Sequence, residues 1–214
     1  MDISPHHLPR FLKAINAELD SNADEIIGLD QAIGDGDHLT NLQRGLEAVQ
    51  KIEVELSEMN WSDALMKIGM TLMSTMGGAS GSLFGSFFLA MSKAAKDKTM
   101  DAQHLAAMFD AGVSSVKQRG KADIGEKTML DSLIPACESL KQDVANNQDL
   151  PLTVANLKQA AEKGMLSTEA MVATKGRASF LGERARGHID AGARTSQLII
   201  SVIADEVIHI QNEN

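Results

Sequence analysis

The sequence is poor in cysteine and in aromatic residues. It has one cysteine and no tyrosine, and aromatic residues make up 3% of its 214 positions. One cysteine excludes a disulfide within the chain. Because Cys137 falls among the spaced apolar residues Leu133, Ile134 and Leu140, we expect a buried structural thiol. The shortage of aromatic residues, beside twelve methionines, argues against a β-sheet and favours an all-α fold.

Basic charge and long apolar runs are also lacking. The formal net charge is −9, so we expect no direct binding to nucleic acid, which requires a basic surface to displace counterions from phosphate. No apolar run approaches the ~20 residues of a membrane span, and residues 1–10 have no apolar signal core. We therefore expect a cytoplasmic protein without membrane contact. Its length predicts a single domain over residues 1–214.

Apolar residues recur at three- and four-residue spacing along most of the chain, which predicts helices. Ser62 is the expected N-cap of the third helix. The apolar run 198–203 resembles a buried strand, but its pattern continues to Ile210, beyond the usual length of a strand, and so indicates a helix. The eight predicted helices cover residues 8–27, 38–52, 62–76, 82–95, 101–118, 128–144, 153–174 and 195–210.

Short connections between eight helices predict a barrel of antiparallel, up-and-down helices, in which alternate connections fall at the same end. The connections after the second, fourth and sixth helices are ordinary polar linkers. The connections after the first, third, fifth and seventh helices hold nearly all the glycine clusters and unusual polar groups. We therefore expect one functional end, formed by residues 28–38, 76–81, 119–127 and 175–193.

The first of these connections carries Asp30, Asp35 and Asp37 among glycines, with no lysine or arginine nearby. Three such carboxylates repel one another unless a cation holds them, and Mg²⁺ fits because it takes a few carboxylates and leaves positions for phosphate oxygens. The alternative is that the aspartates cap a helix and form Asx turns. A calcium-binding EF-hand fits worse, since Asn41 or Leu46 stands where its bidentate glutamate is required.

The second connection, residues 77–82, is rich in glycine and opens into a helix. Its backbone N–H groups and the positive end of the helix dipole suit a phosphate. The alternative is that the glycines only let two helices pack closely. It is not the nucleophile elbow of a serine hydrolase, because Ser82 replaces the second required glycine.

The third connection, residues 120–128, is close to the phosphate loop of Walker-type nucleotide-binding proteins. Glu126 interrupts that motif by standing between Gly125 and Lys127, and no predicted strand precedes it. We therefore reject the Walker interpretation.

The fourth connection, residues 175–193, has the length and polarity of a lid or ligand-binding loop. Arg177 is suited to pair with a phosphate through two hydrogen bonds, or else with Glu183 on a solvated surface. Two interpretations also remain for His38 and for His188, because each is suited to contact a ligand or to satisfy a local hydrogen bond.

Together these connections resemble the nucleotide-binding L subunit of bacterial dihydroxyacetone kinases of the phosphotransferase-linked type. The first stretch contains the motif Gly-Asp-Gly-Asp-His at residues 34–38. The resemblance spans nearly the whole chain and implies a barrel of eight antiparallel helices with ADP or ATP at one end. The matching stretches are residues 28–44, 77–85, 119–128 and 176–192.

The resemblance also implies roles for individual residues. Asp30, Asp35 and Asp37 would hold two Mg²⁺ ions that bridge the phosphates. No further catalytic residue is expected in this chain. One departure is Leu39, where relatives often have glycine. The nucleotide site would be formed by His38, Thr40, Asn41, Ala79, Ser80, Gly120, Met129, Arg177, Asp190 and Gly192.

The chemistry implied by the resemblance is phosphoryl transfer from tightly bound Mg-ATP to dihydroxyacetone held on a partner K subunit. A phosphohistidine on an M subunit would then rephosphorylate ADP, using phosphoenolpyruvate. Two alternatives remain open: a kinase subunit of the same fold that exchanges ATP and acts on another ketose, and an ADP-sensing module read by a transcription regulator. We also expect a homodimer.

Overall fold

The computed structural model describes residues 3–213, and within this range the chain is helical and has no strand. The all-α prediction is therefore confirmed, including the helical interpretation of residues 198–203. The elements are η1 (Pro5–His7), α1 (Leu8–Ser21), α2 (Ala23–Ile33), α3 (His38–Gln50), α4 (Glu53–Ser57), α5 (Trp61–Thr75), α6 (Gly78–Ala95), α7 (Ala102–Gly120), α8 (Leu130–Ala145), α9 (Leu150–Ser167), η2 (Thr168–Ala170), η3 (Arg177–Ala185) and α10 (Ala191–Glu213).

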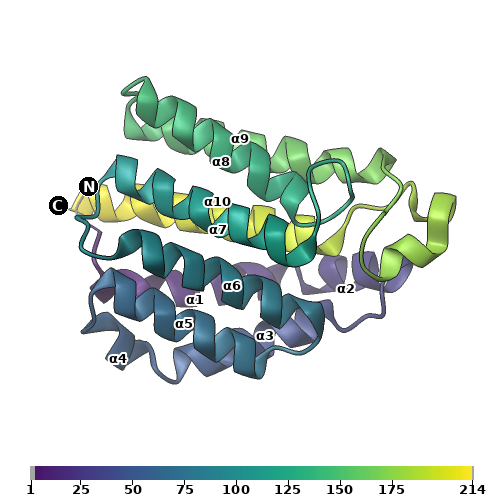
Figure 1. Cartoon of the computed structure of the whole chain (residues 1–214), viewed down its shortest axis with the longest axis horizontal. Coiled ribbons are helices and arrows are strands. Elements are labelled where there is room, and N and C mark those ends of the chain that lie inside the picture. Colours follow the sequence, from purple (N-terminus) through teal and green to yellow (C-terminus); the bar gives the residue numbers. More distant parts are fainter. Residues whose placement is uncertain (1–2, 214) are drawn as a thin grey trace.

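The long helices lie along the long axis of the molecule, with both ends of the chain at one side (Figure 1). In the order α3, α5, α6, α7, α8, α9 and α10, each helix packs against the next, and α1 packs against both α10 and α3. The segments that lead into α3, α6, α8 and α10 all lie at the end away from the termini (Figure 1). This arrangement agrees with the predicted common end.

The prediction of one helix over residues 8–27 was wrong, because the chain breaks at Asn22 into α1 and α2. The side-chain Nδ2 of Asn22 donates to the carbonyl of Glu18 at 2.8 Å and competes with the helix for that acceptor. A second unpredicted helix, α4, lies in the expected polar linker before α5. Neither helix reverses the overall course of the chain between the two ends, so the four glycine-rich connections stay together (Figure 1).

Several helix ends also differ from the prediction. Helix α5 is capped by Asn60, whose side chain accepts from the backbone N–H of Asp63 at 3.0 Å, and not by Ser62. Helix α6 begins at Gly78 instead of residue 82, and α2 continues to Ile33. Helix α9 ends at residue 167 instead of 174, and α10 begins at residue 191 instead of 195. The connections into α3 and α6 are consequently shorter than the sequence suggested, whereas the connection between α9 and α10, residues 168–190, is longer and contains η2 and η3.

The core consists of buried aliphatic side chains from the inward faces of these helices. Leu19, Leu42, Leu72 and Leu198 belong to the main cluster, which joins α1, α3, α5 and α10. Cys137 lies in a second cluster between α7 and α8, and burial raises the pKa of its thiol to about 12. The thiol is therefore structural, as predicted. Within the described residues, no helix has the length and hydropathy to cross a membrane.

Candidate metal and nucleotide site

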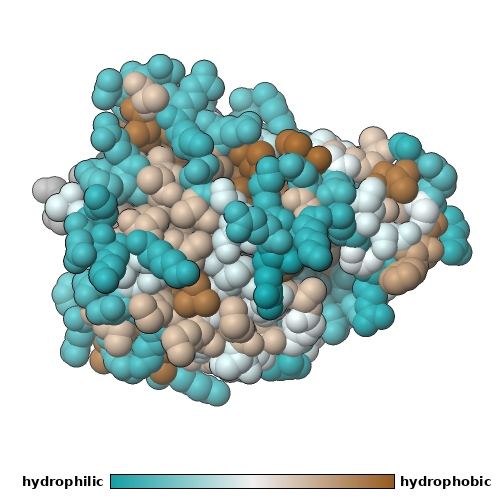
Figure 2. Space-filling view, viewed as in Figure 1, coloured by the Kyte–Doolittle hydropathy of each residue, from teal (hydrophilic) through white to brown (hydrophobic). Residues whose placement is uncertain are grey.

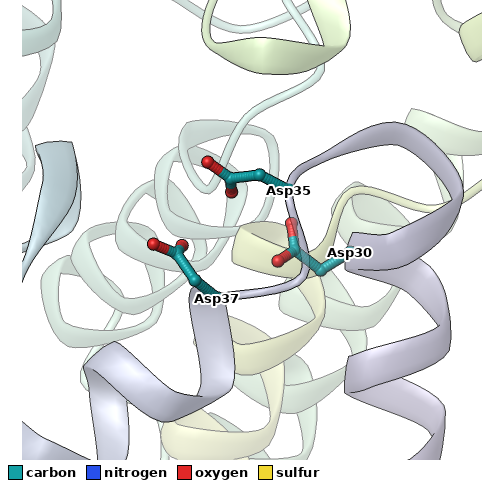
Figure 3. Close-up of side chains that lie close together, drawn as sticks. All are labelled: Asp30, Asp35 and Asp37. Carbon is teal, nitrogen blue, oxygen red and sulfur yellow. The ribbon is translucent and has the colours of Figure 1, made fainter.

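The three predicted aspartates come together at the end of the molecule where α2 leads into α3. Asp30 lies in the last turn of α2, while Asp35 and Asp37 belong to the turn that follows. Each offers one carboxylate oxygen, and these oxygens all lie within 4.8 Å of one another. Figure 3 shows the three carboxylates facing one shared space. The prediction that all three lie in a loop was wrong for Asp30, because α2 extends past it.

Glycines fold the chain back so that Asp30 can join the other two. The backbone N–H of Gly34 donates to the carbonyl of Asp30 at 2.6 Å, and a Cβ atom at residue 34 would lie only 2.0 Å from Asp30 Oδ1. Gly36 has φ = +76°, a left-handed conformation that favours glycine. A side chain at residue 34 would therefore disrupt the cluster.

Helix capping explains only one of the carboxylates. Asp30 Oδ2 accepts from the backbone N–H of His38 at 3.0 Å and so satisfies a free donor at the start of α3. Asp37 is the N-cap residue of α3, but its side chain makes no capping hydrogen bond. Asp35 and Asp37 are both exposed to solvent. The cluster thus keeps carboxylate oxygens that helix capping does not use.

A cationic side chain reaches this cluster from a distant part of the sequence. Arg177, the first residue of η3, places Nε 2.9 Å from Oδ2 of Asp35. The alternative partner considered for Arg177 was Glu183, which instead pairs with Arg186 at 2.6 Å. Arg177 therefore lies beside the segment that was predicted to bind metal.

His38 connects the aspartate cluster to α10. Its Nε2 lies 3.0 Å from Oγ1 of Thr195. Burial lowers the pKa of His38, although the nearby carboxylates of Asp30 and Asp37 oppose that change. Thr195 Oγ1 also hydrogen-bonds to the carbonyl of Gly192 at 3.2 Å. His38 therefore links the start of α3 to the predicted nucleotide residues at the start of α10.

The glycine-rich turn before α6 lies against α3. Asn41 is 4% exposed, and a Cβ atom at residue 77 would lie 2.5 Å from its Oδ1 atom. Gly78 has φ = +64°, and Ala79 and Ser80 follow in the first turn of α6. Thr40 is exposed in the first turn of α3. The first turns of two helices therefore meet beside the aspartates.

A second group of predicted residues lies where α8 and α10 begin. A Cβ atom at Gly192 would lie 3.0 Å from Asp190 Oδ2 and 3.5 Å from Met129 Cβ. Asp190 Oδ2 accepts from the backbone N–H of Ala193 at 2.8 Å, so Asp190 caps α10. Gly120, the last residue of α7, packs near Leu83 of α6 and has no such link to the group.

Two buried charged residues, which were not predicted from the sequence, organise the connection between α7 and α8. Lys127 donates from Nζ to the backbone carbonyls of Thr168 and His188. Asp131 accepts from the backbone N–H of Thr128 at 2.7 Å. The spacing of Thr128 and Asp131 is that of a capping box and could have identified the second residue. The position of Lys127 among carbonyls agrees with the rejection of a Walker loop.

A large cavity between the helices is separate from the aspartates. It has a volume of about 880 Å³, is mainly apolar, and runs between the helices, where Leu46, Phe87, Leu133 and Ile200 are among the side chains that line it. None of the three aspartates lines this cavity. The candidate site is consequently an open surface formed by the ends of helices.

The sequence of residues 32–205 matches the family model described as the DAK2 domain. The chain belongs to the DAK2 domain family. A DAK2 domain relative from Listeria innocua, named PEP-dependent dihydroxyacetone kinase 1, ADP-binding subunit DhaL, is 41% identical over 190 residues, covering 89% of this chain and 90% of the relative. The corresponding ADP-binding subunit DhaL of Escherichia coli is 36% identical over 205 residues, covering 95% and 98%. These relatives are subunits of a kinase.

A solved structure shares the fold of this DAK2 domain. The dihydroxyacetone kinase of C. freundii, in complex with AMP-PNP and Mg²⁺, superimposes with a TM-score of 0.71 at 24% sequence identity. The match covers 92% of this chain and 33% of the C. freundii chain. This chain therefore spans about a third of that larger kinase.

Proposed function

We propose that this chain is the ADP- and ATP-binding subunit of a phosphoenolpyruvate-dependent dihydroxyacetone kinase. The observation that carries the proposal is the cluster of Asp30, Asp35 and Asp37, whose oxygens lie within 4.8 Å of one another beside the first turn of α3. Relatives that carry this activity in their names align over nearly their full length with this chain. The cluster supplies a chemical reason for the same assignment here.

The aspartates are proposed to hold two Mg²⁺ ions. Carboxylate oxygens are the ligands that Mg²⁺ prefers, and the exposure of Asp35 and Asp37 leaves room for phosphate oxygens to complete the coordination. Asp30 keeps Oδ1 for a metal, because Oδ2 is engaged by the backbone of His38. When bound, the metal ions would neutralise charge on the phosphates during transfer.

The remaining predicted residues are proposed to bind the nucleotide in two groups. Ala79 and Ser80 lie at the positive end of α6, which favours a phosphate, and Thr40 and Asn41 lie in the first turn of α3. Arg177, which pairs with Asp35, would contact phosphate oxygens beside the metal ions. The purine would lie toward the group formed by Met129, Asp190 and Gly192, with Gly120 at the end of α7 as a further proposed contact.

We further propose that residues 1–214 form one domain, a barrel of antiparallel helices with the nucleotide at one end. The packing of α10 against both α9 and α1 supports closure. The four connections at the end away from the termini would then form the rim of the nucleotide site (Figure 1). The helices below would hold these connections in fixed positions.

The acceptor half of the reaction is proposed to come from a K subunit that docks at this end. Apolar side chains reach the surface there, between hydrophilic ones (Figure 2). Phe180 in η3 is 84% exposed, and Ile124 in the connection between α7 and α8 is 52% exposed. Exposed apolar groups of this kind fit a protein contact. An M subunit carrying a phosphohistidine would recharge the bound ADP, and the chain would act in the cytoplasm as a homodimer.

Calorimetric titration with ADP and Mg²⁺ tests this proposal. Asp35→Asn should weaken Mg²⁺-dependent ADP binding by about tenfold or more, because it removes one charged ligand, while circular dichroism shows an unchanged helical fold. Asp97→Asn is the matched control: Asp97 is an exposed aspartate between α6 and α7, with φ = 58°, which asparagine tolerates. Equal affinity in the wild type and in Asp35→Asn would refute the metal site.

A further inference from the structure

Lys127 occupies an unusual environment between α7 and α8. Lys127 is 1% exposed, although lysine side chains are almost never buried without partners. Its backbone has φ = +61°, a left-handed conformation that is uncommon for a residue other than glycine. Both features indicate that the surrounding structure holds Lys127 in place.

The ammonium group of Lys127 connects three segments of the chain. Its Nζ donates to the carbonyl of Thr168, where α9 passes into η2, and to the carbonyl of His188, just before α10. Thr168 Oγ1 in turn accepts from the backbone N–H of Asp190 at 3.0 Å. One side chain therefore fixes the connection before α8, the end of α9 and the entry to α10.

The turn that contains Lys127 is itself rigidly held. The carboxylate of Asp131, which is fully buried, accepts from the backbone N–H of Gly125 at 2.5 Å and of Thr128 at 2.7 Å. These two donors lie on either side of Lys127. The adjacent Glu126 accepts from the hydroxyl of Thr174 at 2.7 Å. The left-handed backbone is thus maintained from both sides and directs the lysine inward.

This environment excludes direct phosphate binding by Lys127 but compensates for burying its charge. Burial lowers the pKa of the ammonium, while the nearby carboxylates of Asp190, Glu169 and Asp131 oppose that change. A neutral side chain of similar length would leave the carbonyls of Thr168 and His188 without this donor. Buried acceptors that lose a donor are costly, so the three segments would separate or rearrange.

We propose that Lys127 is a positioning residue that fixes the two walls of the nucleotide site relative to each other. Met129 follows Lys127 by two residues, and Asp190 follows the bonded carbonyl of His188 by two residues. Met129 lies beside Gly192, which follows Asp190 in the first turn of α10. This role rests on the proposed nucleotide function and predicts that Lys127 sets ADP affinity without touching metal or phosphate.

Three variants separate positioning from general stability. Lys127→Met removes both hydrogen bonds and the charge, and Lys127→Arg retains a charged donor. Leu56→Ala is the control, because Leu56 is fully buried and its truncation should also lower the thermal stability. Leu56 belongs to α4, which lies at the end of the molecule opposite the proposed nucleotide site (Figure 1). ADP binding in the presence of Mg²⁺ and binding of Mg²⁺ alone are measured by calorimetry, below the melting temperature of every variant.

Lys127→Met should weaken ADP binding by about tenfold or more and leave the affinity for Mg²⁺ alone unchanged, with substantial recovery in Lys127→Arg. Leu56→Ala should bind ADP as the wild type does. Equal ADP affinity in Lys127→Met and the wild type would refute the positioning role, whereas absence of ADP binding in the wild type would refute the nucleotide function itself. If Lys127→Met does not fold, Thr168→Val is measured in its place, because it removes the hydroxyl that accepts from the backbone N–H of Asp190. Thr168→Val should weaken ADP binding and leave the affinity for Mg²⁺ alone unchanged. An unchanged affinity of Thr168→Val for ADP would refute the positioning role.

Discussion

The guanidinium Nε of Arg177 lies 2.9 Å from Oδ2 of Asp35, which joins η3 to the aspartate cluster. The Arg177 side chain is 72% exposed, and the preceding Gly176 has φ = +63°, so the arginine enters from a turn that favours glycine. A positive group therefore occupies the place where the proposed metal ions and phosphates meet. In the proposed site, Arg177 would compete with Mg²⁺ for Asp35 and would also bind phosphate.

These two roles predict opposite effects of Arg177→Met. Mg²⁺ alone should bind as tightly as in the wild type or more tightly, because a competitor for Asp35 is removed. ADP with Mg²⁺ should bind about five- to tenfold more weakly, because a charged partner of the phosphates is lost. The melting temperature should change by no more than a few degrees, since an exposed ion pair contributes about 0–1 kcal/mol.

Calorimetry with Mg²⁺ alone and with ADP measures the two effects separately. Arg184→Met, which removes another exposed arginine of η3, is the control for the change in net charge. Weaker binding of ADP in both variants to the same degree would show that only the overall charge matters.

A second prediction concerns thermal stability. The three aspartates repel one another, so ligands that neutralise them and bind only the folded protein should stabilise it. At a ligand concentration 100 times the dissociation constant, Mg²⁺ with ADP should add about 2.7 kcal/mol and raise the melting temperature by roughly 5–10 °C. Mg²⁺ alone should do less. A chelator that leaves the melting temperature of an ADP-loaded sample unchanged would exclude a metal-held nucleotide.

The course of the helices was largely predictable because it follows from local patterns. Apolar periodicity identified α3 and α7 with starts within one residue of those observed, and Asp101 caps α7 by accepting from the backbone of His104. The common end of the four connections followed from counting helices. The two unpredicted helices did not disturb that count, since α2 continues toward the end that α1 approaches and α4 lies within a connection (Figure 1).

The remaining features depend on tertiary contacts that no local pattern encodes. Arg177 and Asp35 are far apart in the sequence, so their pairing could not be preferred over a pair with Glu183. The burial of Lys127 depends on carbonyls of α9 and of the segment before α10. The break at Asn22 had a signal, because asparagine competes with the helix for hydrogen bonds, but apolar periodicity continued through it.

A third prediction uses the unusual pKa of Asp190. Burial raises this pKa from 3.8 to about 6, although the backbone N–H of Ala193 and the charge of Lys127 lower it, while Asp131 and Asp30 add to the increase. The folded protein therefore holds a proton on Asp190 more tightly than the unfolded chain does. Protonation of Asp190 therefore adds to the free energy of unfolding. This contribution is fully present below about pH 3.8 and is lost as the pH rises to about 6.

Asp190→Asn should remove this pH dependence while keeping an acceptor for the backbone of Ala193. The free energy of unfolding of Asp190→Asn minus that of the wild type should therefore increase from about pH 4 to pH 6, by at most about 3 kcal/mol. Urea denaturation at pH 4.5, 5.5 and 7.0 measures the difference. Asp149→Asn, at the exposed N-cap of α9, is the control for losing the charge of a capping aspartate. A difference that does not change with pH would contradict the raised pKa.

The last prediction is that this chain alone, loaded with ATP and Mg²⁺, does not phosphorylate dihydroxyacetone at a useful rate. The proposed site would use carboxylates for metal, and backbone donors and Arg177 for phosphate. The large cavity between the helices does not suit the acceptor, because it is mainly apolar and none of the three aspartates is among the described residues that line it. We therefore expect the acceptor hydroxyl and the base that receives its proton to come from the proposed K subunit.

General-base assistance is worth about 10²–10⁴ in rate, and alignment of two reactants is worth more, so the isolated chain should be slower than the complex by several orders of magnitude. The assay compares product formed by the chain alone with product formed after a K subunit is added, first with excess ATP and then with a phosphoenolpyruvate-driven donor system. Phe180→Ser should reduce the gain from the K subunit without changing ADP affinity, because Phe180 is the most exposed apolar side chain at this end. Full turnover by the single chain would instead mean that it carries its own acceptor site.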